Sequence, residues 1–346
     1  MPTNVTADYI KAEQAFRAAR EPRDRLTCLK EMLRTIPKHK GTEHLQADIK
    51  SRIKALTEEL AGPKKGAART GPVQTVRAEG AAQIALLGPP NSGKSSLHAA
   101  LTGSHANAAP YSFTTKELLP GMLAWEDIHF QLIDLPPIAA DYMENWMPNA
   151  LQPADAALLV IDINDPDCVE HVSMVRAQLA GKKIHLIAQW PGFSEAQVAE
   201  PTAEDEAELR DPFHIELPTL VIANKIDLCD GPEDVRVLQD LLEGDYPILA
   251  LSALTLQGAD ELRDFLFRGL DVVRVYTKSP GKSAATDKPF TLRKGQTVAD
   301  VARLVHKDVA RTLRYARLWG SGRFAGQQVG PQHEVNDGDV LELHSA

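Results

Sequence analysis

Several residue types and patterns that define specialised protein classes are scarce or missing in this sequence of 346 residues. Its three cysteines (Cys28, Cys168 and Cys229) lie far apart without a CxxC pair, which argues against a disulfide scaffold or a zinc site and fits a reducing compartment. There is no run of about 18 apolar residues, so we expect no membrane-spanning helix. The N-terminal segment MPTNVTADYIKAEQ lacks the apolar core of a secretory signal, and we therefore expect a cytoplasmic protein.

What is present is typical of a globular chain with uneven charge. Hydrophobic residues make up 43% and charged residues 25%, which argues against a collagen-like or mostly disordered protein. Residues 1–80 contain 16 Lys and Arg against 10 Asp and Glu, residues 81–287 contain 13 against 31, and residues 288–346 contain 9 against 6. We therefore expect any polyanionic partner at the two basic ends, unless these charges only solvate helix faces.

Composition divides the chain into three regions. Residues 1–75 combine two stretches with apolar residues at helical spacing and a Gly-, Pro- and Lys-rich linker at 62–72. Residues 80–277 form the largest region, and KSPGKSAATD at 278–287 is a second linker. Residues 286–346 are expected to form a small α+β unit.

The central region has the pattern of an α/β domain. Short apolar runs alternate there with helical patterns, and they occupy residues 82–87, 128–133, 156–161, 220–223 and 248–251. Continuous apolar strands separated by helices predict a mostly parallel sheet with both faces covered. Residues 122–125 add an antiparallel edge strand, and the Pro- and acid-rich stretch 191–215 is expected to be an exposed insertion.

The segment GPPNSGKS, from Gly88 to Ser95, fits the phosphate-binding pattern GxxxxGK[ST] and follows a predicted strand. The glycines allow successive N–H groups to point inward around a phosphate, and the next helix directs its positive N-terminal end at the same anion. Lys94 is expected at the β- and γ-phosphates and Ser95 at Mg²⁺. The nucleotide-binding residues predicted from this loop are Gly88, Asn91, Ser92, Gly93, Lys94, Ser95 and Ser96.

A second motif, NKID, indicates which base is bound. Asn224, Lys225 and Asp227 follow an apolar strand, and an Asp at this place accepts hydrogen bonds from the N1–H and amino group of guanine, neither of which adenine offers. ATP would leave that carboxylate without a hydrogen-bond donor, and the energetic cost of this disfavours ATP binding. Ser252-Ala253-Leu254, after the next strand, fits a backbone contact to the guanine O6.

Two further segments are expected at the metal. Asp134 ends a predicted strand and suits a carboxylate that holds Mg²⁺ through water. The segment Phe113-Thr114-Thr115 lies where a switch loop must supply a hydroxyl, and Thr115 is the preferred ligand, although ordinary loop polarity also explains these threonines.

The order GPPNSGKSS, YSFTT, DLP, NKID and SAL resembles that of the Obg-like GTPases in the Ras-like P-loop class. The tail beginning KPFTLRKGQTVADVARLVHKD resembles a TGS domain, a small β-grasp module. IPKHKGTEHLQADIK is similar to the developmentally regulated GTP-binding (DRG) branch. The likeness covers nearly the whole chain and implies an N-terminal helical segment, a Ras-like G domain and a C-terminal α+β TGS domain.

This resemblance implies a GTPase working as a molecular switch on ribosomes or RNA, with Lys94 and Thr115 as its catalytic residues. We expect its intrinsic turnover to be slow. Family members with an asparagine at the position of Asn91 often bind K⁺, so Asn91 is a candidate K⁺ ligand beside the expected Mg²⁺. The alternative is a guanine-nucleotide-binding adaptor with negligible hydrolysis, in which the TGS module and basic helices contact RNA.

The sequence departs from the DRG pattern in two places. The family has DxPG and a glycine-rich segment, whereas here Pro137 follows Asp134-Leu135-Pro136, and Ile138 stands where a water-orienting glutamine is usual. Proline lacks the N–H that the usual glycine donates to the γ-phosphate, which predicts a smaller preference for GTP over GDP. The large insertion of eukaryotic DRG proteins is absent, and residues 183–215 at most take its place.

The tail also contains candidate RNA-binding residues. Cations next to aromatic rings offer charge and stacking surfaces for RNA. The cations are Arg303, Lys307, Arg311, Arg314, Arg317 and Arg323, and the aromatic residues beside them are Tyr315, Trp319 and Phe324. The alternative is that Tyr315 and Trp319 belong to the core and the arginines only add solubility.

Overall fold

A computed structural model of the chain describes residues 6–19, 22–37, 42–61, 76–103, 118–144, 146–193, 213–229, 231, 233–242, 246–279 and 288–345. The predicted switch residues Phe113, Thr114 and Thr115 lie outside these ranges. So do the linker at 62–72, most of the insertion at 191–215 and most of the second linker.

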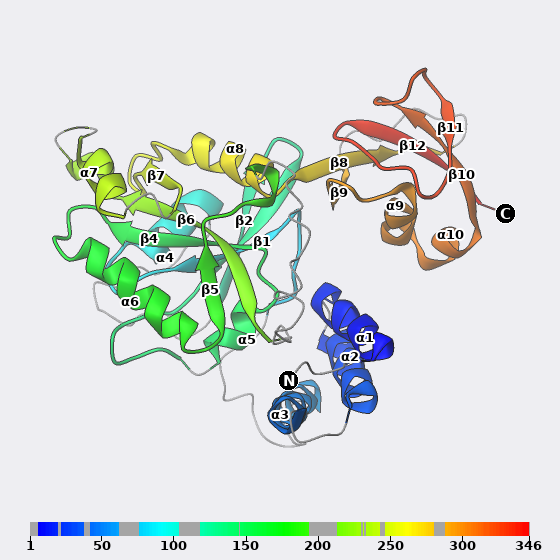
Figure 1. The fold of residues 1–346 in the computed structure, drawn as a ribbon. Helices are drawn as coiled ribbons and strands as arrows, with labels where there is room; N and C mark the ends of the chain where they lie inside the picture. Colours follow the sequence, from blue (N-terminus) through cyan, green and yellow to red (C-terminus); the bar gives the residue numbers. More distant parts are fainter. Residues whose placement is uncertain are drawn as a thin grey trace.

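The central domain contains a largely parallel sheet that runs through its middle (Figure 1). Its strands are β1 (Gln83–Leu87), β2 (Leu119–Trp125), β3 (Ile128–Asp134), β4 (Ala156–Asp162), β5 (Ile184–Ile187), β6 (Ile215–Asn224) and β7 (Ile248–Leu251). They lie in the order β2-β3-β1-β4-β6-β5, and β7 pairs with the second half of β6. Only β2 is antiparallel to its neighbour, as the sequence predicted for an edge hairpin.

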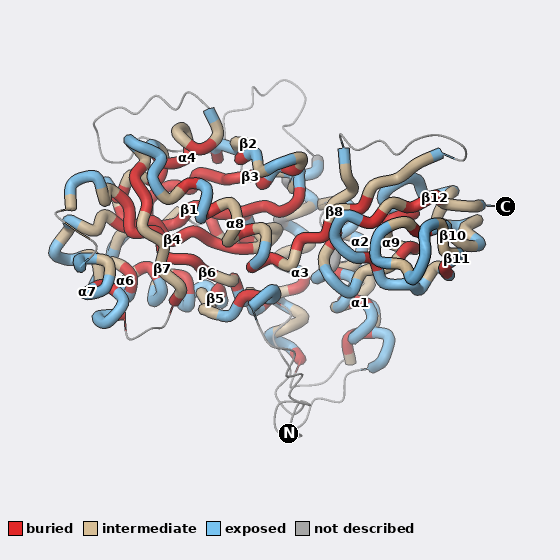
Figure 2. The backbone as a smooth tube through the Cα atoms, turned by 90° about the horizontal axis from the view of Figure 1, so that it is seen from above, coloured by how far each residue is buried: buried red, intermediate tan, exposed pale blue. Residues whose placement is uncertain are grey.

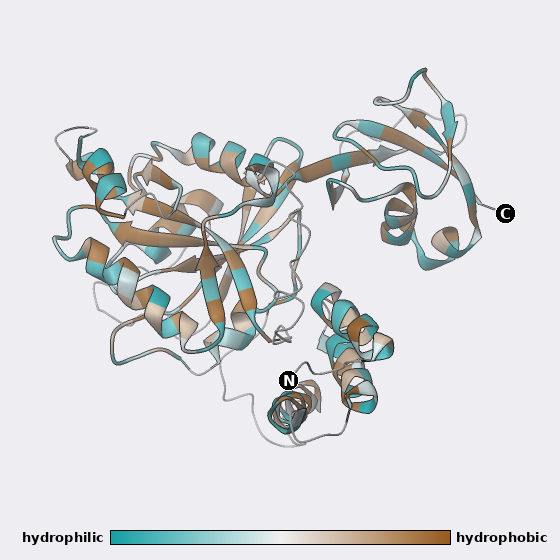
Figure 3. Ribbon diagram, viewed as in Figure 1, coloured by the Kyte–Doolittle hydropathy of each residue, from teal (hydrophilic) through white to brown (hydrophobic). Residues whose placement is uncertain are grey.

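Helices cover both faces of this sheet, because its strands alternate apolar side chains up and down and bury both sets. One face packs against α4 (Lys94–Thr102) and α8 (Ala259–Gly269), and the other against α5 (Met147–Leu151), α6 (Cys168–Ala180) and α7 (Glu233–Leu241). The central strands β1, β3 and β4 are almost wholly buried (Figure 2) and form the hydrophobic centre of the domain (Figure 3). The α/β fold class is confirmed.

The N-terminal region forms three helices rather than the predicted two: α1 (Ala7–Ala18), α2 (Pro22–Thr35) and α3 (Glu43–Ala61). Their apolar stripes meet in a separate core that contains Tyr9, Leu29 and Ile49. Part of their contact with the central domain is polar: Arg25 donates to the side-chain and backbone oxygens of Gln152, at 3.2 and 3.3 Å.

One residue of the predicted insertion completes this N-terminal core. Phe213, just before β6, is only 2% exposed, and its ring lies 6.0 Å from that of Phe16 and 4.0 Å from the Arg52 guanidinium. The expectation of an exposed insertion is therefore wrong at this residue. The aromatic side chain packs between helices, and the Pro- and acid-rich composition of the stretch gives no sign of this contact.

The C-terminal domain is a five-stranded sheet with helices on one side (Figure 1). Its strands lie in the order β11-β10-β12-β8-β9, and their bounds are β8 (Val272–Thr277), β9 (Phe290–Arg293), β10 (Leu313–Trp319), β11 (Gln327–Val329) and β12 (Asp339–Ser345). The helices are α9 (Val298–Val305) and α10 (Lys307–Thr312). Thr297 and Asp300 form a capping box at the start of α9.

Strand β8 corrects the expected domain boundary. The sequence placed residues up to 277 in the G domain and began the C-terminal domain at 286, yet β8 pairs with β12 and β9. Its apolar pattern is that of any buried strand, so only the pairing reveals which sheet it joins. Arg274 on β8 also contacts Glu126 and Asp127 in the turn between β2 and β3, and the Tyr276 hydroxyl donates to Asp127.

We expect Phe213→Ala to destabilise the packing of α1–α3, since truncating a buried Phe typically costs about 3–5 kcal/mol. Amide hydrogen exchange should quicken in these helices while α6 keeps its protection. Phe193→Ala is the matched control, because that ring is 45% exposed and contacts Phe265 instead. Unchanged exchange in α1–α3 would show that Phe213 is not part of their core.

Candidate nucleotide-binding site

The loop from Gly88 to Gly93 joins β1 to α4, and two of its glycines are required by neighbouring strands. Gly88 has φ 145°, and a Cβ there would lie 2.2 Å from the carbonyl oxygen of Val160. Gly93 has φ 91°, and a Cβ there would lie 2.3 Å from Nδ2 of Asn224. No larger residue fits at either position without moving β4 or β6. The loop is therefore held close to the carboxyl ends of the parallel strands.

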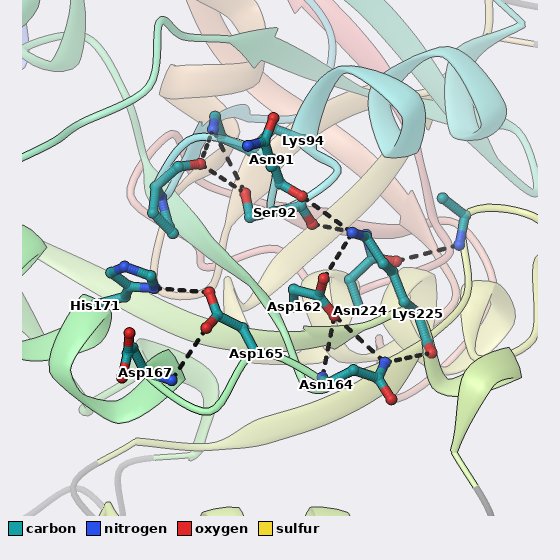
Figure 4. Close-up of polar contacts among 12 residues, drawn as sticks. Asn91, Ser92, Lys94, Asp162, Asn164, Asp165, Asp167, His171, Asn224 and Lys225 are labelled. Atoms are coloured by element: carbon teal, nitrogen blue, oxygen red, sulfur yellow. Dashed lines mark hydrogen bonds and ion pairs between the residues drawn. The ribbon is translucent and has the colours of Figure 1, made fainter. Parts of the chain in front are cut away.

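Lys94, the first residue of α4, turns back into this loop (Figure 4). Its Nζ donates to the carbonyl oxygens of Gly88 at 3.1 Å and Pro89 at 2.7 Å, and the side chain is buried. Burial lowers the pKa of Lys94 to about 8, while the nearby Asp134 carboxylate opposes that change. An anion inside the loop would favour the charged form and raise this pKa again.

Ser95 and Asp134 meet beside the loop. The Ser95 hydroxyl donates to Oδ2 of Asp134 at 2.6 Å, and Asp134 is fully buried at the end of β3. The parallel register pairs Leu86 with Asp134, which brings the end of β3 to the start of the loop. A hydroxyl and a carboxylate at one point form an oxygen-donor set of the kind that Mg²⁺ prefers.

The NKID segment joins the loop to the serine-alanine segment after β7. Asn224 is buried, its Nδ2 donates to the Ser92 carbonyl at 3.0 Å, and its Oδ1 accepts from the Ala253 N–H at 3.2 Å. Lys225 has φ 67° and extends over the loop, where Nζ donates to the Asn91 carbonyl at 3.1 Å. These three predicted motifs therefore lie together at one edge of the sheet.

Asp227 lies at the rim of the same edge, in the short 3₁₀ helix Ile226–Leu228. Its carboxylate accepts from the Ser252 hydroxyl, and that hydroxyl oxygen accepts from the N–H groups of Leu254 and Thr255. The Leu254 side chain is 82% exposed. Ser96 is exposed on the first turn of α4.

A polar pair at the end of β4 belongs to this arrangement and was missed in the sequence. Oδ2 of Asp162 accepts from Lys225 Nζ at 2.6 Å, while Asn164 donates to Asp162 Oδ1 and, at 3.2 Å, to the Lys225 carbonyl (Figure 4). Burial alone raises the pKa of Asp162, but the hydrogen bonds from Lys225 and Asn164 hold it below its usual value. The available clue was a polar residue directly after an apolar strand, at the same sheet edge as Asn224.

The segment after Asp134 is also packed against the loop. Pro136, Pro137 and Ile138 are buried. The Ile138 N–H donates to the Gly88 carbonyl at 3.1 Å, and the Ala139 N–H donates to the Tyr142 carbonyl at 2.9 Å. Both amides that follow Pro137 are therefore bonded to protein carbonyls.

Two family profiles match the chain. One, described as 50S ribosome-binding GTPase, matches residues 83–190, and the other, the TGS domain, matches residues 273–345. The crystal structure of a GTP-binding protein from Pyrococcus horikoshii OT3 shares the fold, with a TM-score of 0.50 over 76% of this chain and 100% of that chain at 18% identity. The fold and the matched profiles define a P-loop GTP-binding protein.

Relatives match nearly the whole chain. An uncharacterised GTP-binding protein of Methanocaldococcus jannaschii is 27% identical over 98% of this chain and 94% of its own. Developmentally-regulated G-protein 3 of Arabidopsis thaliana is 27% identical over 90% and 95%, and developmentally-regulated GTP-binding protein 1 of Xenopus laevis 26% over 90% and 96%. Over about 90% of its length the chain is similar to developmentally regulated GTP-binding proteins, as the sequence motifs implied. In the part of the chain that the structure describes, no helix has the length and apolarity to cross a bilayer.

We expect Asp162→Asn to weaken GDP binding about fivefold, because removing the charge loosens Lys225 from the loop, and a partly exposed ion pair contributes about 1 kcal/mol. Titration calorimetry with GDP measures the change. Asp165→Asn is the matched control, since Asp165 bonds to His171 and to the Asp167 N–H. Equal affinity in the two variants would remove Asp162 from the site.

Proposed function

We propose that this protein hydrolyses GTP to GDP and phosphate as a molecular switch that acts on ribosomes or RNA. The observation that carries the nucleotide assignment is the Asn224 side chain, which bonds to Ser92 and Ala253 and so joins the phosphate loop to both predicted guanine motifs. An adventitious glycine-rich turn has no reason to meet an NKxD segment and a serine-alanine segment at one sheet edge.

In this proposal the loop amides and Lys94 bind the phosphates. The Lys94 ammonium is already inside the loop, where carbonyl oxygens hold it, so a phosphate oxygen replaces a weaker acceptor. Hydrolysis then depends on positioning and on neutralising charge as it develops on the phosphoryl oxygens. The proposed nucleotide contacts are Gly88, Asn91, Ser92, Gly93, Lys94, Ser95, Ser96, Phe113 and Thr114 on the phosphate side, and Asn224, Lys225, Asp227, Ser252, Ala253 and Leu254 on the base side.

Oxygen donors suit the site to Mg²⁺. Ser95 would bind it directly, Thr115 would supply a second hydroxyl and Asp134 would hold it through water. Bound Mg²⁺ supplies charge neutralisation at the phosphates. Among the described residues no three His, Cys, Asp or Glu side chains gather as a metal site, and a hydroxyl, a carboxylate and phosphate oxygens need no such cluster. Asn91 is the proposed ligand of an accelerating K⁺.

Turnover is the measurement that tests the function. We expect slow GTP hydrolysis by the protein alone and faster hydrolysis when K⁺ or ribosomes are added, compared with Na⁺ at equal ionic strength. GDP binding without turnover under every condition would instead support the adaptor. The packing of Pro137 and the bonded Ile138 N–H favour that second candidate, because they leave the switch segment with fewer amides for a γ-phosphate.

Guanine selectivity should depend on Asp227. Asp227→Asn should weaken GTP and strengthen xanthosine triphosphate, because the amide donates to the extra carbonyl of xanthine. Competition against a fluorescent nucleotide measures both affinities. Asp260→Asn, on the exposed start of α8, is the matched control. An unchanged preference would reject the base assignment.

Pro137→Gly should raise the affinity for GTP relative to GDP. A restored N–H to a charged phosphate is worth about 1.5–3 kcal/mol, roughly 10- to 150-fold. The amides of Ile138 and Ala139 can replace it only by leaving the carbonyls of Gly88 and Tyr142. Pro136→Gly restores an N–H one residue earlier and is the control. A large GTP preference in the parent, unaltered by Pro137→Gly, would refute this account.

A further inference from the structure

Among the described residues, no helix covers one face of the C-terminal sheet. α9 packs Val298 and Val301 against Ala316 and Leu318 of β10, which forms the core of this domain. Since side chains alternate along a strand, Tyr315, Arg317 and Trp319 lie on the opposite face, which we call the open face. Both aromatic residues are half-buried there. They are therefore not members of the domain core, which argues against the alternative that Tyr315 and Trp319 are core residues.

The cations of this domain differ in their pairing. On the helical side, Arg303 is paired with Asp300, and Arg311 lies 3.4 Å from Asp308. Arg317 is exposed on the open face and, within the described part of the chain, has no hydrogen-bond or ion-pair partner. An unpaired arginine can bind a phosphate without first breaking an internal ion pair.

On the open face, the Tyr315 ring lies beside open space next to a glycine. The rings of Tyr315 and His344 are stacked, with centroids 4.6 Å apart, which leaves the far face of Tyr315 turned toward β11. β11 pairs Val329 with Ala316, so Gly330 is the next residue and lies opposite Tyr315. A Cβ on Gly330 would have no atom within 4 Å. The space beside Gly330, next to the Tyr315 ring, is therefore open, and we call it the slot.

A carboxylate, Glu342, lies opposite Arg317 on the neighbouring strand β12 and is itself paired. Glu342 accepts from His344 at 2.8 Å and lies 3.4 Å from Lys278 Nζ. Lys278 in turn sits 3.5 Å above the Trp319 ring, which fixes its ammonium at the surface of the open face. Glu342 thus balances the charge of Lys278, and Arg317 leaves the open face with a net positive charge beside the aromatic slot.

We propose that the open face binds single-stranded RNA, with one base in the slot between Tyr315 and Gly330 and a backbone phosphate on Arg317. The proposal rests on the proposed function, in which RNA is a partner, and adds the surface and the form of RNA. A flat ring and flanking cations are the groups that bind unpaired bases and their phosphates. A duplex stacks its bases internally and so has none to place in the slot.

The test measures binding of the full-length protein to a short fluorescent single-stranded RNA by anisotropy, with a duplex of the same sequence as competitor. Gly330→Leu fills the slot without removing any polar group, and its φ is not in the left-handed region. We expect it and Tyr315→Ala to weaken binding about tenfold, within the range for loss of one stacked base. Arg317→Gln should lower the slope of log affinity against log salt by about 0.7, the value for one phosphate contact on a single strand.

Arg311→Gln is the matched control for Arg317→Gln, because it removes a cation from the helical side. GDP affinity, measured in parallel, should be the same in all variants. If the parent binds RNA and the open-face variants bind as Arg311→Gln does, the open face is not the site, whereas RNA as a partner stands. If the parent binds only the duplex while GDP binding is intact, the open-face proposal fails. If it binds no RNA at all, the RNA part of the proposed function fails as well. Tighter binding to a protein than to RNA through this face would also overturn it.

Discussion

The Asn224 carboxamide is the interaction on which the nucleotide-site geometry depends. Its two ends satisfy a loop carbonyl and a backbone N–H that belong to segments 132 and 29 residues away in sequence. Because the side chain is buried, losing either bond would leave an unsatisfied polar group, which costs about 1–3 kcal/mol. The same side chain lies against Gly93, where a Cβ would collide with it. The glycine in the loop and the asparagine on β6 are therefore two parts of one contact.

A second constraint concerns how the C-terminal domain is attached. β8 follows α8 directly, so the chain passes from the G domain into the second sheet without a linker. Arg274 and Tyr276 then hold the turn between β2 and β3 through Asp127. Arg293, on β9, donates to the Ala81 carbonyl at 2.9 Å just before β1. A truncation that isolates the G domain must therefore end before β8, since a cut at 286 would leave β8 without its sheet.

The sequence predicted the parts of this molecule that local chemistry determines. Apolar runs defined the strands, including the antiparallel edge strand that pairs with β3. The sequence did not predict which strands pair with each other, because β8 has the same apolar pattern as a strand of the first sheet. Phe213 was missed for a related reason: a single aromatic in a polar stretch does not indicate which helices it will contact.

The same distinction applies to the site. GxxxxGKS and NKID are short segments in which the residues that act are also the residues that form the pattern. Asp162 and Asn164 act on Lys225, which is more than sixty residues away, and only the β4–β6 register brings them to it. The sequence offers one positional clue: polar residues that directly follow buried parallel strands converge at the carboxyl-terminal edge of the sheet. Asp134, Asp162, Asn224 and Ser252 all end or follow such strands.

The β2–β3 hairpin lies between the nucleotide-binding edge and the sheet that carries the proposed open face. At one end, β3 terminates in Asp134, whose carboxylate accepts from Ser95. At the other, the turn at Asp127 is bonded to β8, and β8 lies beside β12, the strand that carries His344 and Glu342 of the open face. Two hydrogen-bonded strands of seven residues each move together more readily than they separate, because each shares a full antiparallel ladder with the other. The nucleotide edge and the C-terminal sheet are therefore connected by one rigid element, in addition to the covalent path through α8.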